Sequence, residues 1–153
     1  ARRAGVKLKL IGHGDPTVTK ELITYGENLG ALHEADRNEV MARAKALICP
    51  TMYIEPFGCI SPEAQLCGTP VISTDAGGFI ETVEHGKTGY RCSMMGEFID
   101  AIHRVDTLDR NYIRVRAQRL YSMETAAVSY DKYFKKLETL WKDGWNTVPY
   151  VID

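Results

Sequence analysis

The chain has 153 residues, of which 44% are apolar and 25% charged, and its formal net charge at pH 7 is −1. This is the ordinary balance of a soluble globular domain, and a nearly neutral chain gives no electrostatic reason to expect a nucleic-acid partner. No apolar run approaches the roughly 18 residues of a membrane-spanning helix, so no span is expected. The N-terminus has neither Met nor an apolar signal core, so we expect an internal part of a longer protein.

In chain order, hydrophobic periodicity and Gly/Pro breaks predict short strands alternating with helices. The expected strands are residues 6–11, 22–25, 46–49, 71–73 and 90–92. The expected helices are a short turn at 17–21, a helix capped by Asp36 or Asn38 and running to about residue 46, and residues 58–67 and 79–84. From Gly96 on the pattern is helical, with later helices at 111–121 and 125–141.

This alternation of short apolar strands with helices predicts the α/β class. We expect a Rossmann-like parallel sheet with helices on both faces, joined by right-handed crossovers. The length fits one domain, which we place at residues 1–142, with residues 143–153 as an irregular tail.

Cysteine and histidine usage gives a further expectation. Four cysteines are present: Cys49, Cys59, Cys67 and Cys92. They contain no Cys-x-x-Cys pair, so we expect no disulfide framework and a reducing, cytoplasmic location. Cys59 could be a helix-start thiolate of lowered pKa, but its neighbours Phe57 and Ile60 favour burial. The histidines match no metal-ligand spacing, so no bound metal is expected.

Residues 50–78 carry the strongest chemical pattern, with two carboxylates, Glu55 and Glu63, eight positions apart. Pro56 restricts Glu55 to an extended conformation, which suits a carboxylate that accepts hydrogen bonds from ligand hydroxyls. Gly58 allows close approach of a ligand, and if a helix starts there its free N–H groups form an anion site. A sugar, a diphosphate and a ribose would satisfy this order of groups.

The same residues also fit an ordinary helix start. In that interpretation Ser61 is the N-cap, Pro62 occupies the first helical position, and Glu63 only interacts with the helix dipole. Glu55 is then a solvated loop acid, and the spacing alone does not decide between the two interpretations.

Two glycine turns are open to a similar choice. Gly12-His13-Gly14 follows the first strand, where ligands of α/β domains bind, but it lacks the Gly-x-Gly-x-x-Gly fingerprint and an ordinary turn is favoured. Residues 75–78, Asp-Ala-Gly-Gly, could bring backbone close to a substrate or could simply start the next helix.

The C-terminal segment is basic, with eight Lys/Arg against three Asp/Glu between Arg110 and Lys142. A solvated helix face is the favoured interpretation, and peripheral contact with an anionic membrane or acceptor is the alternative. Aromatic residues recur at helical spacing over residues 130–141, which indicates core or a surface for a missing domain.

At this point the residues resemble a known family, the family-4 (group 1) retaining glycosyltransferases. That signature is a Glu, seven residues and a second Glu, followed by Gly-Thr-Pro-Val-Ile and a Gly-Gly-x-x-Glu turn. The matching segments are residues 10–15, 55–63, 68–72, 77–81 and 86–90, and the resemblance spans roughly residues 6–140.

The resemblance implies a GT-B architecture of two facing Rossmann-like domains, with this chain as the C-terminal, donor-binding half. Glu55 would be the catalytic-site residue that contacts the donor sugar, and Glu63 would hold the ribose hydroxyls. Gly12 and Gly14 would line the diphosphate side, with Leu32 near the base. The backbone facing sugar and diphosphate would come from Phe57, Gly58, Cys59 and Ile60.

The resemblance also implies partners. The donor would be a nucleotide-sugar, with UDP- or GDP-sugars expected first, and no cofactor or catalytic metal would be needed. A missing N-terminal domain would bind a glycan or lipid acceptor, and the parent protein could associate with a membrane.

This sequence departs from the family pattern in three places. Only residues 1–5 precede the first strand, so the family's first strand and its basic Gly-Arg…Lys-Gly loop are expected to be missing. Cys59 stands where an aliphatic residue is usual, and Pro62 should weaken one early helical bond. The absent loop keeps an alternative open, a non-catalytic nucleotide-sugar-binding or interaction module. An epimerase or a phosphorylase of similar two-domain form lacks supporting motifs.

Overall fold

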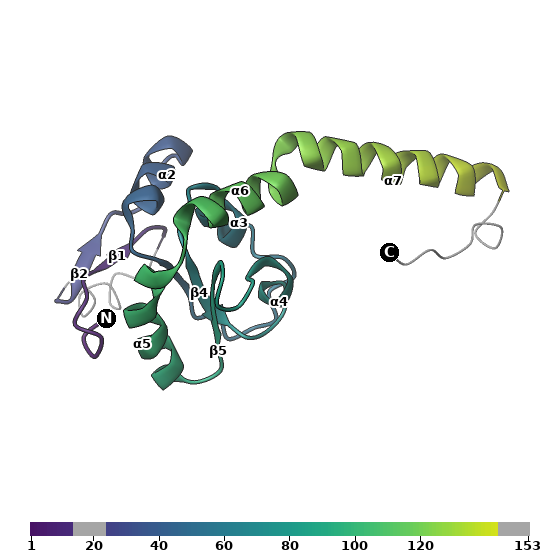
Figure 1. The fold of residues 1–153 in the computed structure, drawn as a ribbon. Coiled ribbons are helices and arrows are strands. Elements are labelled where there is room, and N and C mark those ends of the chain that lie inside the picture. The colour runs from purple at the N-terminus through teal and green to yellow at the C-terminus, as the bar shows by residue number, and fades with distance from the viewer. Residues whose placement is uncertain (14–23, 144–153) are drawn as a thin grey trace. The chain divides into compact units, whose positions relative to one another are not determined.

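The computed structural model describes residues 1–13 and 24–143, and Figure 1 traces its elements along the chain. The strands are β1 (Leu8–Leu10), β2 (Gly26–Asn28), β3 (Leu47–Cys49), β4 (Val71–Thr74) and β5 (Gly89–Cys92). The helices are α2 (Glu34–Arg43), α3 (Ile60–Leu66), α4 (Phe79–Thr82), α5 (Met95–Arg104), the 3₁₀ turn η1 (Val105–Thr107), α6 (Arg110–Tyr121) and α7 (Met123–Asp143). The chain divides into two compact units, Ala1–Val115 and a second that starts at Arg116.

All strand pairings in the first unit are parallel, as predicted, but the described strands form two sheets rather than one. One sheet contains β1 and β2, and the other has the order β3-β4-β5. Figure 1 shows the β1–β2 pair apart from β4 and β5. The carboxyl ends of parallel neighbours meet at one edge, which is where ligands of such folds bind.

Helices cover both faces of the three-stranded sheet, which confirms the predicted layering. Side chains of β4 alternate between the faces, so Ile72 joins one core cluster and Val71 the other. The Ile72 cluster includes Tyr90, Cys92 and three residues of α5 and η1: Ala101, Ile102 and Val105. The Val71 cluster includes residues of α2, α3 and α4: Met41, Ala64 and Phe79.

The second strand lies later in the chain than predicted. The sequence placed it at residues 22–25, whereas β2 is Gly26–Asn28. Gly26 pairs with Leu8, and a Cβ there would clash with the Leu8 carbonyl oxygen. Glycine is needed at this position because the neighbouring strand leaves no room for a side chain. It does not mark the end of a strand. Residues 17–21, a predicted turn, lie outside the described residues.

Helix starts also differ from the predictions. Helix α2 begins at Glu34 with His33 as N-cap, so neither Asp36 nor Asn38 caps it. Glu34 and Asp36 instead lie in the first turn, where acids interact favourably with the helix dipole. The helix predicted from Gly58 begins at Ile60.

Burial of the cysteines differs from the prediction at one position. Cys49 and Cys92 are buried, but Cys59 is exposed, so its predicted burial is wrong. Cys59 is the N-cap of α3, and a helix end on the surface leaves its side chain in solvent.

In the second unit, α7 runs for 21 residues from Met123. Ser122 Oγ accepts a hydrogen bond from the Thr125 N–H at 3.2 Å, which favours a helix start just after Ser122. Tyr130, Tyr133 and Phe134 are exposed, so they do not form a core among the described residues. In the described part of the chain, α7 and every other helix fall short of the length and apolar character needed to cross a membrane.

Candidate functional site

The loop from Glu55 to Gly58 joins β3 to α3 and rests on the Gly77-Gly78 turn after β4. The Gly78 N–H donates to the Glu55 carbonyl oxygen at 2.7 Å. A Cβ at Gly77 would lie 2.5 Å from that same oxygen, and a Cβ at Gly78 would lie 2.6 Å from Phe57 Cα. The two glycines therefore let two backbone segments pack together, a role that neither sequence interpretation included.

Gly58 is also required by its surroundings. Its φ is +72°, a left-handed conformation that side chains rarely adopt, and it is buried. A Cβ there would lie 2.8 Å from Cε1 of the buried Phe79. Packing against Phe79 accounts for this glycine without any ligand.

The Glu55 side chain is half-buried and has one protein partner that the sequence did not indicate. Tyr53 Oη donates to Glu55 Oε2 at 2.9 Å, and this bond raises the pKa of Tyr53. Burial, with a smaller effect of the Glu55 charge, raises the pKa of Cys49 to about 12. Cys49 is therefore a neutral thiol beside the carboxylate and not a nucleophile.

Helix α3 brings Glu63 to the same edge of the sheet. Cys59 is the N-cap, and the first helical bond runs from the Glu63 N–H to the Cys59 carbonyl oxygen at 3.1 Å. Ser61 therefore lies inside the helix and is not its N-cap. Pro62 falls among the first positions, whose N–H groups have no helical partner, so it costs no helical bond, contrary to our expectation.

Glu63 is more than a solvated helix-start acid because it pairs with a cation from another helix. Arg37 Nη2 of α2 lies 3.0 Å from Glu63 Oε2, and the two side chains are 32% and 37% exposed. Arg37 is absent from the residues that the sequence singled out.

A cavity of about 600 Å³ lies between the edges of β1 and β3. Its lining includes every residue of 6–12 and 44–48, with Val40 and Met41 of α2 on one side and Ile102 and Val105 on the other. Three predicted site residues, Gly12, Leu32 and Ile60, meet at this cavity together with Arg37. Glu55, Phe57, Gly58, Cys59 and Glu63 do not line it, and Gly14 lies outside the described residues.

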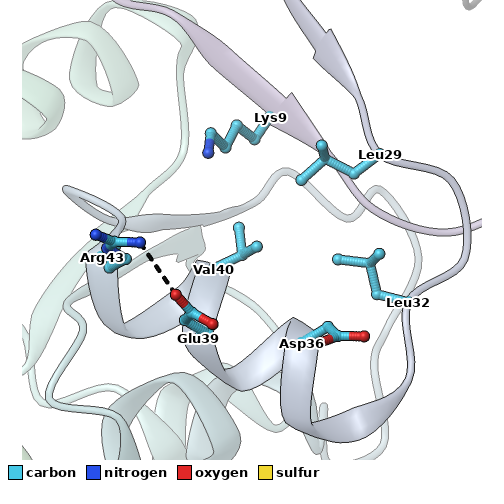
Figure 2. A pocket seen from close by; sticks show the side chains of 7 residues that line it. All are labelled: Lys9, Leu29, Leu32, Asp36, Glu39, Val40 and Arg43. Carbon is cyan, nitrogen blue, oxygen red and sulfur yellow. Dashed lines mark hydrogen bonds and ion pairs between the residues drawn. The ribbon is translucent and has the colours of Figure 1, made fainter.

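A second, smaller cavity of about 270 Å³ adjoins the first between β1 and α2 (Figure 2). Lys9 projects from β1 toward α2, where Asp36 lies along the helix and Glu39 pairs with Arg43 at 3.0 Å. Leu32 and Val40 border both cavities.

Comparison with protein families shows the class to which this chain belongs. Residues 1–106 match the family described as "Glycosyl transferases group 1". The chain belongs to the group 1 glycosyltransferases, which confirms the predicted family at that level.

One curated relative and two solved structures illustrate the relationship. The chain is 32% identical over 108 residues to D-inositol 3-phosphate glycosyltransferase 2 of Catenulispora acidiphila, covering 64% of this chain and 25% of that protein. AviGT4, a glycosyltransferase involved in avilamycin A biosynthesis, superposes with a TM-score of 0.76 at 22% identity, covering 90% of this chain and 45% of that one. HepE from Anabaena in complex with UDP superposes with a TM-score of 0.73 at 22% identity. The match covers 86% of this chain and 41% of the HepE chain.

These likenesses confirm the fold class, parallel sheets with helices on both faces as in GT-B glycosyltransferases. The chain spans about a quarter of the length of the curated relative and less than half of each solved structure.

Proposed function

We propose that this chain is the donor-binding half of a retaining glycosyltransferase that transfers a hexosyl group from a nucleotide-sugar to a glycan or lipid acceptor. One observation carries the proposal: in a group 1 family chain, Gly12, Leu32 and Ile60 lie in the segments that follow β1, β2 and β3, at the carboxyl edge of the parallel strands. The UDP bound to the HepE structure supports a UDP-sugar donor, with a GDP-sugar as the alternative.

In this proposal the two carboxylates have separate partners. Glu55 accepts hydrogen bonds from the donor sugar, and its direction is set by the Gly78 contact to its backbone and by Tyr53. Glu63 accepts from the ribose hydroxyls. Neutral hydroxyls suit carboxylates, whereas two carboxylates facing the diphosphate directly would repel it.

Backbone groups and cations stabilise the leaving diphosphate without a metal. The backbone groups come from Gly14 and the loop residues Phe57, Gly58, Cys59 and Ile60.

We also propose that a strand from polypeptide preceding Ala1 completes the sheet between β1 and β3. A cavity beside one face of a strand would be lined by alternate residues, whereas this one is lined by consecutive residues of both strands and so adjoins their edges.

Hydrogen exchange on a chain extended upstream tests the added strand. The amides of alternate residues that face the open edges, those of Lys9 and Ile48 among them, should exchange at least about tenfold more slowly than in the present chain, because they become paired. The amides of Leu8 and Leu47 already donate to the carbonyl oxygens of Tyr25 and Pro70 and should change less. Helix α5 serves as the internal reference and should be unchanged. Equal exchange at both edges with and without the extension would refute the added strand.

The remaining proposals concern the parent protein. We infer an acceptor-binding domain N-terminal to this one, a donor domain that ends near residue 142, and a cytoplasmic location. Peripheral membrane contact would involve the basic faces of α6 and α7, whose excess of Lys and Arg suits an anionic surface.

By itself the present chain is expected to bind donor weakly, if at all, and not to turn over, so a thermal-shift panel of UDP-, GDP- and ADP-sugars on the chain extended upstream tests the proposed function. A ligand present at 100 times its Kd stabilises the folded state by about 2.7 kcal/mol, so the cognate nucleotide-sugar should raise Tm by about 5–10 °C. Free glucose serves as the control and should give no shift. A panel in which no nucleotide-sugar raises Tm would contradict the proposal.

A further inference from the structure

Arg37 occupies a position on α2 where an apolar residue would be expected. Arg37, Val40, Met41 and Ala44 follow one another at helical spacing, and all four line the cavity between β1 and β3. Because α2 leads into β3, the Arg37 end of this row lies toward the carboxyl edge of the strands, where Gly12 and Ile60 also line the cavity. The one cation in an apolar row therefore faces the proposed donor site.

The Arg37 guanidinium is held from one side by Glu63. Nη2 lies 3.0 Å from Glu63 Oε2, and both side chains are about one-third exposed. A guanidinium carries five N–H donors in a rigid fork, so a single carboxylate oxygen uses only part of its capacity. The ion pair fixes the fork and leaves donors for a second acceptor.

The charges around the larger cavity are of one sign. Its lining contains Lys7, Lys9, Arg37 and Lys45, and no Asp or Glu of the described residues contributes to it. Lys45 pairs with Asp106 at 2.7 Å. Asp36 and Glu39 border the smaller cavity instead, where Glu39 is held by Arg43. The added strand proposed above fills the space between β1 and β3, so of these cations it is Arg37, at the carboxyl edge beside Gly12 and Ile60, that faces the proposed donor site.

We propose that Arg37 binds the diphosphate of the nucleotide-sugar and that Glu63 holds it in position while accepting hydrogen bonds from the ribose. This inference rests on the proposed function. Arg–phosphate pairs form two parallel N–H···O bonds, and the fixed fork of Arg37 is suited to that geometry. Arg37 then supplies, from within α2, a positive charge for the leaving group.

Calorimetric titration of UDP and uridine into the chain extended upstream, as wild type, Arg37→Met and Arg43→Met, tests this assignment. Each substitution removes one guanidinium from α2 and breaks one Arg–Glu pair of 3.0 Å, so Arg43→Met is a matched control. Arg37→Met should weaken UDP binding about 10- to 100-fold, the worth of a charged hydrogen bond, and uridine binding less than about threefold. Arg43→Met should change neither UDP affinity nor uridine affinity. The UDP affinity of Arg37→Lys should lie between that of Arg37→Met and that of the wild type. GDP with guanosine and ADP with adenosine complete the panel.

The outcomes separate this inference from the proposed function. If the wild-type chain binds none of the three diphosphates, the proposed function fails and the inference fails with it. If the wild-type chain binds UDP but Arg37→Met binds it equally well, or loses UDP and uridine alike, only the Arg37 assignment is overturned. If Arg37→Met does not fold, Arg37→Lys provides the test. Replacing the guanidinium fork by an ammonium group must lower the affinity for UDP more than the affinity for uridine.

Discussion

Glu63→Ala is expected to weaken binding of the cognate nucleoside diphosphate about 100-fold. The substitution removes the acceptor proposed for the ribose hydroxyls, and it also removes the 3.0 Å partner of Arg37. Hydrogen bonds to charged groups are worth about 1.5–3 kcal/mol each, and a loss of about 2.7 kcal/mol corresponds to 100-fold in Kd. Calorimetric titration measures the change directly.

Two variants serve as controls for that experiment. Glu55→Ala should leave nucleotide affinity within about threefold, since its proposed partner is the sugar, and should mainly lower transfer in the full-length enzyme. Glu39→Ala removes an exposed partner of Arg43 and should have no effect on nucleotide affinity. Identical titration curves for wild type and Glu63→Ala would refute the ribose assignment.

Gly78→Ala is expected to lower the free energy of unfolding by about 3 kcal/mol. The new Cβ would lie 2.6 Å from Phe57 Cα and 2.7 Å from Phe57 O, and backbone atoms cannot rotate away as a side chain can. Separating the two segments would also stretch the 2.7 Å bond from the Gly78 N–H to the Glu55 carbonyl oxygen. Gly78 has φ −60°, which alanine adopts readily, so urea denaturation reports the clash alone.

Gly96→Ala provides the matched control. Gly96 lies in the first turn of α5, and nothing lies within 4 Å of a Cβ built there. Alanine should therefore be neutral or should stabilise the helix by up to about 1 kcal/mol. A cost below about 1 kcal/mol for Gly78→Ala would show that the turn does not support the Glu55 loop.

The order of strands and helices was predictable because it follows from local periodicity, but positions that depend on distant partners were not. The predicted strand ended at Tyr25, and glycine, the next residue, is disfavoured in strands. In the structure it lies inside β2, where the Leu8 carbonyl oxygen leaves no room for a Cβ. Nothing within several residues of Gly26 carries that information.

In the candidate site, too, residues whose role depends on a distant partner could not be predicted. Glu55 and Glu63 could be singled out from their spacing and from the family resemblance. Arg37 was missed because its partner is 26 residues further along the chain. One signal was available, a single cation in the apolar row formed with Val40, Met41 and Ala44, and it would have drawn attention to this position.

The Gly77-Gly78 turn was the least predictable feature. The sequence offered two roles, close approach to a substrate or the start of α4, and Gly78 is indeed the N-cap of α4. The close contact with the backbone of Glu55 and Phe57 joins segments about twenty residues apart. Only the packed structure shows that this turn supports the loop carrying Glu55.

Backbone NMR of the ¹⁵N-labelled chain extended upstream, titrated with the nucleoside diphosphate selected by the thermal-shift panel, shows whether nucleotide binds at the carboxyl edge of the strands. Saturable amide shifts should be concentrated at Gly12, Leu32 and the loop from Gly58 to Ile60, with Gly96 unchanged. The absence of saturable shifts, or shifts concentrated on α7, would contradict binding at this edge.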